Sequence, residues 1–231
     1  MDHSRLLAFV TLMVMSSGST GLGQPNADLP LAEDRELPKN PITGQIPLED
    51  AKILGFKLGS SPLAAIKLRM GVARAFRAGG EGSALALCYS SVDAGDDTAL
   101  LFQARALGGW KTLTEFAIAP RTSIRGFGTH CVESKEVSRS VGTAGGIRLG
   151  MGRDEFRRHF RRSPTIETAD SVVYHFLKEV KVAGRKGHDI GAEASTAQTG
   201  SPSTCDLISG IQARFHDNRL IWLVVYKATA C

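Results

Sequence analysis

The sequence of 231 residues predicts an α+β fold built from two tandem repeats, each with helices packed on a small antiparallel sheet. The first observation is a motif of Gly, apolar, basic, Leu and Gly that occurs at 55–59 and again at 146–150. The second is the order Gln-Ala-Arg, found in apolar surroundings at 103–105 and 212–214. An internal repeat of this kind predicts that one structural unit is built twice.

The repeats divide the chain into segments. The first repeat spans 53–120 and the second spans 144–231, with a connector at 121–143 that is rich in Ser, Thr and Gly. Residues 24–52 hold five of the nine prolines and few apolar residues, which is typical of a linker. The alternative is a chance similarity, because the two copies share few identical residues.

In the first repeat, Ser61 and Pro62 are expected to start a helix, since a hydroxyl cap followed by proline favours helix entry. The helix is expected to end near 79–80. A strand is predicted at 84–90, followed by a hairpin of 98–107 and 111–119.

In the second repeat, residues 153–162 predict a strong helix, because Phe156 and Phe160 lie four residues apart on one side. A strand is predicted at 171–180, and a final hairpin at 208–216 and 219–227. Relative to the first repeat, 22 extra residues fall in the polar loop at 184–204.

Residues 1–23 resemble an export signal. Arg5 precedes an apolar stretch at 6–15, and small residues follow at 16–23. The apolar stretch is too short to span a bilayer, and no later segment predicts a transmembrane span. The alternative is a buried N-terminal helix. We expect the mature protein in the periplasm or secreted, in an oxidising compartment.

The four cysteines predict two disulfide bonds, since an even number in an exported chain favours pairing. The final hairpin brings Cys205 nearly opposite Cys231, which leaves Cys88 to pair with Cys131. The alternative is four free, buried thiols. The spacing does not fit a zinc site, so we predict no metal, and no sequence motif predicts a cofactor.

The eleven residues 146–156 resemble the motif of the SmpA/OmlA (BamE) type of bacterial envelope domain, with Gly-Met followed by an acidic pair and an apolar residue. Gly152 stands where that family prefers Thr or Ser, so a weaker helix cap is expected. A tandem pair of such units is similar to the beta-lactamase inhibitor protein architecture. This resemblance implies a concave protein-binding surface and a non-enzymatic role.

Two groups of side chains are candidates for binding. Trp110, Trp222 and Tyr226 lie near or on the last strands of the two repeats, and we expect Trp222 and Tyr226 on the side of their strand that faces away from the helices. The second group is the basic side of the second helix, with Arg157, Arg158, Arg161 and Arg162. The alternatives are a core position for the aromatic residues and an ordinary solvated face for the arginines.

The chain is predicted to be an exported, non-enzymatic protein-binding module of the cell envelope, either an assembly factor or an inhibitor. Its partner is expected to be another envelope or secreted protein, and the net charge of +5 also suits an anionic lipid or glycan. Nucleic acid is not expected. One alternative is an envelope hydrolase that uses His175 or His216, although no Gly-x-Ser-x-Gly motif occurs. Another is a module that binds a lipid or a glycan.

Overall fold

The computed structural model describes most of the chain from residue 40 onward. The described ranges are 40–78, 84–105, 110–124, 131–182 and 203–230. The predicted export signal at 1–23, most of the predicted linker and the polar loop at 184–202 lie outside the described residues. Two eight-residue α-helices are present in the described ranges, α1 (Leu63–Met70) and α2 (Arg153–Phe160), together with a short 3-10 helix, η3 (Arg121–Ser123).

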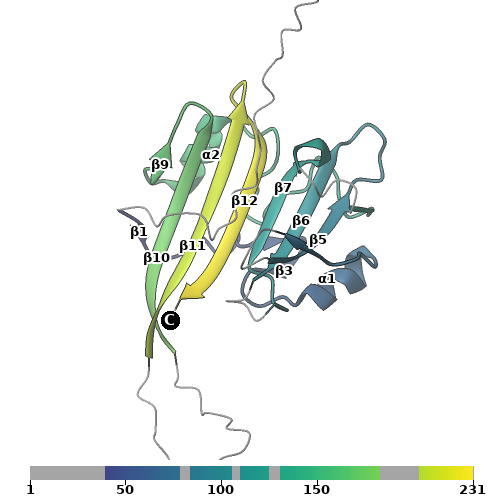
Figure 1. Cartoon of the computed structure of the whole chain (residues 1–231). Coiled ribbons are helices and arrows are strands. Elements are labelled where there is room, and N and C mark those ends of the chain that lie inside the picture. Colours follow the sequence, from purple (N-terminus) through teal and green to yellow (C-terminus); the bar gives the residue numbers. More distant parts are fainter. Residues whose placement is uncertain (1–39, 79–83, 106–109, 125–130, 183–202, 231) are drawn as a thin grey trace, which may run out of the picture.

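Twelve strands accompany them. They are β1 (Ile42–Thr43), β2 (Lys52–Ile53), β3 (Phe56–Lys57), β4 (Phe76–Ala78), β5 (Ala84–Ser90), β6 (Thr98–Ala104), β7 (Glu115–Pro120), β8 (Val132–Glu133), β9 (Ile166–Glu167), β10 (Ser171–Val182), β11 (Ser203–His216) and β12 (Arg219–Ala230). Ten form one sheet in the order β1-β10-β11-β12-β7-β6-β5-β4, with β8 beside β5 and β9 beside β10. Strands β2 and β3 form a separate hairpin. Figure 1 shows the long strands β10, β11 and β12 on one side and β5, β6 and β7 on the other.

The predicted fold class is wrong. Strands make up 48% of the structure and helices only 12%, and the strands expected in two small sheets belong to one large mixed sheet. The two groups of strands join where β12 pairs with β7, with Leu223 opposite Ile118 and Tyr226 opposite Glu115. An unpaired strand exposes backbone donors and acceptors, so pairing the two edges satisfies both. Sequence similarity between segments carries no information about that pairing.

Several individual elements agree with the sequence. The strand predicted at 84–90 is β5, and the final hairpin is β11 and β12, joined at Asp217 and Asn218. Both turn residues have positive φ, +48° and +60°, as a two-residue turn of this type requires. The first helix is shorter than predicted, because α1 ends at Met70 and the chain continues into β4.

The sheet has two sides, which we call the helix face and the opposite face. The helix face carries the larger core, in which α2 contributes Phe156 and Phe160 and the sheet contributes residues such as Tyr174 and Val225. The opposite face carries a second cluster built largely from alanines of β5, β6 and β7 together with Trp222. Burial on both sides makes the middle strands apolar on both sides, so they lack a clear alternation of apolar and polar residues.

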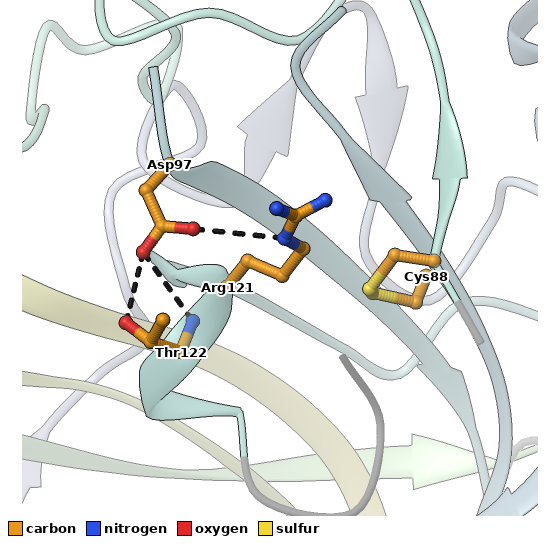
Figure 2. The surroundings of a disulfide bond; sticks show 5 residues. Cys88, Asp97, Arg121 and Thr122 are labelled. Carbon is orange, nitrogen blue, oxygen red and sulfur yellow. Dashed lines mark hydrogen bonds and ion pairs between the residues drawn. A yellow bond between two sulfur atoms is a disulfide. The ribbon is translucent and has the colours of Figure 1, made fainter. Parts of the chain in front are cut away.

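The predicted disulfide between Cys88 and Cys131 is confirmed. It links β5 to the segment before β8, across a sequence separation of 43 residues. Figure 2 shows the disulfide near Asp97, whose carboxylate accepts a hydrogen bond of 2.8 Å from the Thr122 hydroxyl and lies 3.6 Å from the Arg121 guanidinium. The connector is therefore tied to the sheet at this end by a covalent bond and by polar contacts.

The second predicted pair, Cys205 with Cys231, involves a residue outside the described part of the chain. Cys205 is disulfide-bonded. It directly precedes Asp206, which pairs with Ala230 in the hairpin register.

Replacing Cys88 and Cys131 together with alanine is expected to lower the free energy of unfolding by about 2–4 kcal/mol, because the crosslink restricts the unfolded chain. Urea denaturation of the oxidised variant and the oxidised wild type measures the difference. Substituting Ser140, an exposed residue of the same connector, by alanine is the control. An unchanged midpoint in the cysteine variant would contradict the prediction.

Candidate binding surface of helix α2

Helix α2 is held to the sheet by aromatic packing. Phe156 is fully buried and Phe160 is 7% exposed. The Phe160 ring stacks on Tyr174 with a centroid distance of 4.3 Å, and the Phe156 ring meets that of Phe215 at 5.6 Å. Gly152 caps the helix without a side-chain hydrogen bond, as expected, and Asp154 in the first turn compensates for part of that loss through the helix dipole.

A second anchor holds α2 from its side. His159 Nε2 lies 2.9 Å from a carboxylate oxygen of Asp50, which is 1% exposed and also accepts a hydrogen bond from the Thr143 hydroxyl at 3.1 Å. Gly145 lies against the same carboxylate, where an added Cβ would stand 2.1 Å from Asp50 Oδ1. This cluster joins three segments that are distant in sequence, and sequence reasoning missed it because its members are isolated polar residues.

The predicted arginines all lie on the exposed side of α2 and in the turn that follows it. Arg161 adopts a left-handed conformation with φ of +49°, and this ends the helix and places Arg161 and Arg162 beside its last turn. The arginines surround a shallow hollow of about 510 Å³. Its lining residues are Asp154, Arg157, Arg158, Arg161, Arg162, Ser163 and Pro164. We call this the arginine surface.

Most of the charge on the arginine surface is not neutralised. Glu167 on β9 lies 2.9 Å from Arg153 and 3.8 Å from Arg157. Arg158, Arg161 and Arg162 form no ion pair in the part of the chain that the structure describes. Three exposed guanidinium groups are thus available to an anionic partner.

Trp222 and Tyr226 lie on the side of β12 that faces away from the helices, as expected, but that side is buried, so their prediction as exposed binding residues is wrong. Trp222 is 2% exposed and Tyr226 is 4% exposed, and both pack in the cluster on the opposite face. Since β12 pairs with β7, it is an inner strand of the large sheet rather than the edge of a small one. Trp110 is 38% exposed and is not a member of that cluster. The three side chains do not form a common surface.

A buried polar row crosses the opposite face where β12 meets β7. The paired positions along it are His175, Gly210, Tyr226, Glu115 and Gln103. The Tyr226 hydroxyl contacts Nδ1 of His175, and it reaches that atom by passing over Gly210, where an added Cβ would stand 2.3 Å from the hydroxyl oxygen. Sequence reasoning missed this row. Glu115, the one acidic residue in the strand predicted at 111–119, could have indicated it.

The histidines of the hydrolase hypothesis lie apart. Gly210, the partner of His175, and His216 are six residues apart on β11, which corresponds to about 20 Å along a strand. His216 is exposed beside Asp217 in the hairpin turn. The two side chains therefore cannot serve one catalytic site.

In the residues that the structure describes, no three potential metal ligands from His, Cys, Asp and Glu come together. None of the described helices has the length and apolar character needed to cross a membrane.

No family model matches the chain, and neither a curated protein nor a solved structure matches it.

Proposed function

We propose that the protein is an exported binding protein of the cell envelope that uses the arginine surface to hold an acidic region of another envelope or secreted protein. The observation that carries this proposal is the set of three exposed arginines, Arg158, Arg161 and Arg162, without ion pairs in the described structure. Arg158 lies on helix α2, and Arg161 and Arg162 follow its last turn. The helix is anchored by Phe156 and by the Asp50–His159 contact. The backbone that carries the three arginines is already ordered by this packing, so partner binding costs little backbone entropy.

The chemistry of the surface favours a protein carboxylate as the bound group. Guanidinium groups bind carboxylates through two parallel hydrogen bonds, and arginine is enriched in protein interfaces.

A membrane surface is the less favoured partner. A helix that lies in the lipid interface inserts its apolar side among the acyl chains. The apolar side of α2 consists of Phe156 and Phe160, and the core of this protein already occupies it. The disulfide between Cys88 and Cys131 supports an oxidising compartment, and the resemblance of 146–156 to envelope domains supports the same location.

The test is in-cell crosslinking of the exported protein, followed by identification of the captured partner by mass spectrometry and measurement of its affinity. In the variant Arg158→Gln, Arg161→Gln and Arg162→Gln, we expect the affinity to fall at least about 30-fold, since truncating one partner of a desolvated charge pair costs about 2 kcal/mol or more. The exposed positions of the three residues predict an unchanged melting temperature.

The matched control removes the same charge elsewhere, by replacing Arg74, Lys111 and Lys135 with Gln, all of them exposed. Capture that survives in this control and disappears in the α2 variant supports the proposal. Equal loss in both variants would indicate general charge attraction and would contradict it. Binding to phosphatidylglycerol vesicles that depends on the same three arginines, with no protein captured, would assign the surface to lipid instead.

A further inference from the structure

Three lysines from separate strands gather on the helix face, away from the arginine surface. On the neighbouring strands β12 and β11, Lys227 is paired in register with Ser209. The next row on the same face runs from Thr229 of β12 through Leu207 of β11 to Lys178 of β10. Positions that are paired in register, or two residues apart along a strand, lie on the same side of a sheet. Lys178 and Lys227 therefore project from the same face, on neighbouring rows.

The third lysine, Lys57 on β3, is brought there by a turn. The Gly59 amide donates to the Leu113 carbonyl at 2.7 Å, and the Lys227 amide donates to the adjacent Thr114 carbonyl at 2.8 Å. The turn at 57–61 and strand β12 are thus bonded to the same short segment. The side chain of Lys227 extends over this turn, and a Cβ added at Gly59 would stand 3.6 Å from its Cδ and 3.9 Å from its Nζ.

Lys227 feels the positive charge of the other two lysines, and no carboxylate of the described residues is paired with any of the three. Burial, followed by the charges of Lys57 and Lys178, lowers the pKa of Lys227. Within the described ranges, none of the three forms an ion pair. The acidic residues nearest to Lys178 along the register, Glu179 and its partner Asp206, project from the opposite face.

We propose that Lys57, Lys178 and Lys227 form a binding site for a phosphate group. Three ammonium groups on one side of a sheet create a positive potential that attracts anions. A phosphate group carries close to two negative charges and several acceptor oxygens, whereas a carboxylate carries one charge and two oxygens. Lysine acts as a point charge toward phosphate, so it does not require the planar geometry that arginine requires. This site is independent of the arginine surface and of the function proposed for it.

The probe is pyrophosphate, titrated calorimetrically into the exported protein and compared with sodium chloride at equal ionic strength. Each of the variants Lys57→Gln, Lys178→Gln and Lys227→Met is expected to weaken binding about tenfold, equivalent to about 1.4 kcal/mol. Methionine preserves most of the partly buried stem of Lys227. Since Lys178 is exposed, its variant tests the site even when a change at Lys227 impairs folding.

Two further variants separate this site from the rest of the molecule. The triple variant at Arg74, Lys111 and Lys135 and the triple variant at Arg158, Arg161 and Arg162 are both expected to bind pyrophosphate as the wild type does. Wild-type affinity in a variant lacking all three lysines, loss of binding in the arginine variant, or no binding beyond that seen with chloride would overturn the proposal.

A vesicle experiment distinguishes the two sources of a phosphate group. Binding to phosphatidylglycerol vesicles but not to phosphatidylcholine vesicles, with competition by pyrophosphate and loss in the lysine variants, would assign the site to a lipid headgroup. Pyrophosphate binding without vesicle binding would assign it to a soluble phosphate compound. Either result supports the lysine site. Vesicle binding that is retained in the lysine variants would place the lipid contact elsewhere and would contradict a lipid role for the lysine site.

Discussion

Phe156→Ala is expected to lower the free energy of unfolding by about 3–5 kcal/mol, because the substitution leaves a large cavity under a short helix. The Phe156 side chain is fully buried, and its ring meets those of Phe160, Tyr174 and Phe215 at centroid distances of 5.3, 6.0 and 5.6 Å. Urea denaturation followed by circular dichroism measures the change. The eight residues of α2 cannot form a stable helix by themselves, so the packing of Phe156 carries much of its stability.

The same substitution tests the link between fold and function. The arginine surface requires an ordered α2, so Phe156→Ala is also expected to weaken partner capture although no arginine is changed. Leu68→Ala on α1 is the control, because Leu68 is 90% exposed and its truncation should change stability by less than about 0.5 kcal/mol. A loss of under 1 kcal/mol for Phe156→Ala would show that α2 is not anchored as described.

Glu115→Ala is expected to lower the free energy of unfolding by about 3–5 kcal/mol, since it removes one partner of a buried ion pair with Arg105. Glu115 Oε2 lies 3.5 Å from Arg105 Nη2, and both side chains are 3% exposed. The pair lies beside the junction of β12 with β7, so its loss should destabilise both groups of strands. Thermal and urea unfolding, followed by two probes, would measure the loss.

Two controls identify the cause of that loss. Glu136→Ala breaks an exposed pair with Arg69 and is expected to cost only about 0–1 kcal/mol. The double variant Arg105→Met and Glu115→Leu replaces the buried pair by apolar side chains of similar size, and it should recover most of the stability lost in Glu115→Ala. A double variant as unstable as the single one would mean that the loss of Glu115 from the polar row, rather than the loss of its ion pair with Arg105, accounts for the lower stability.

Local structure could be predicted from the sequence where a short-range pattern determines it. The strand at 84–90, the final hairpin and α2 all appear in the structure. Each is specified by neighbouring residues, such as Phe156 and Phe160 on one side of the helix, or Asp217 and Asn218 at the turn of the hairpin. The pairing of Cys88 with Cys131 followed from the register expected for that hairpin. The charge of the arginine surface could also be predicted, because Arg157 and Arg161, like Arg158 and Arg162, are four residues apart, a spacing that places side chains on one side of a helix.

Other features of the candidate sites could not be predicted from the sequence. Whether Trp222 and Tyr226 are exposed depends on the strand that lies next to β12, and the sequence does not specify it. The Asp50–His159 contact joins residues 109 positions apart, and the lysine cluster joins β3, β10 and β12. Contacts at such separations depend on the path of the whole chain, to which no local pattern corresponds.

The sequence by itself determined the longer strands, helix α2, the start of α1, the first disulfide and the location of positive charge near α2. Each of these depends on residues close together or on the chemistry of single side chains. Only the tertiary structure decided that two groups of strands form one sheet, that the aromatic side chains of β12 are buried and that three lysines share one side. The physical reason is that backbone hydrogen bonding between β12 and β7 is nearly independent of side-chain identity, so strand order is set by the packing of the complete chain.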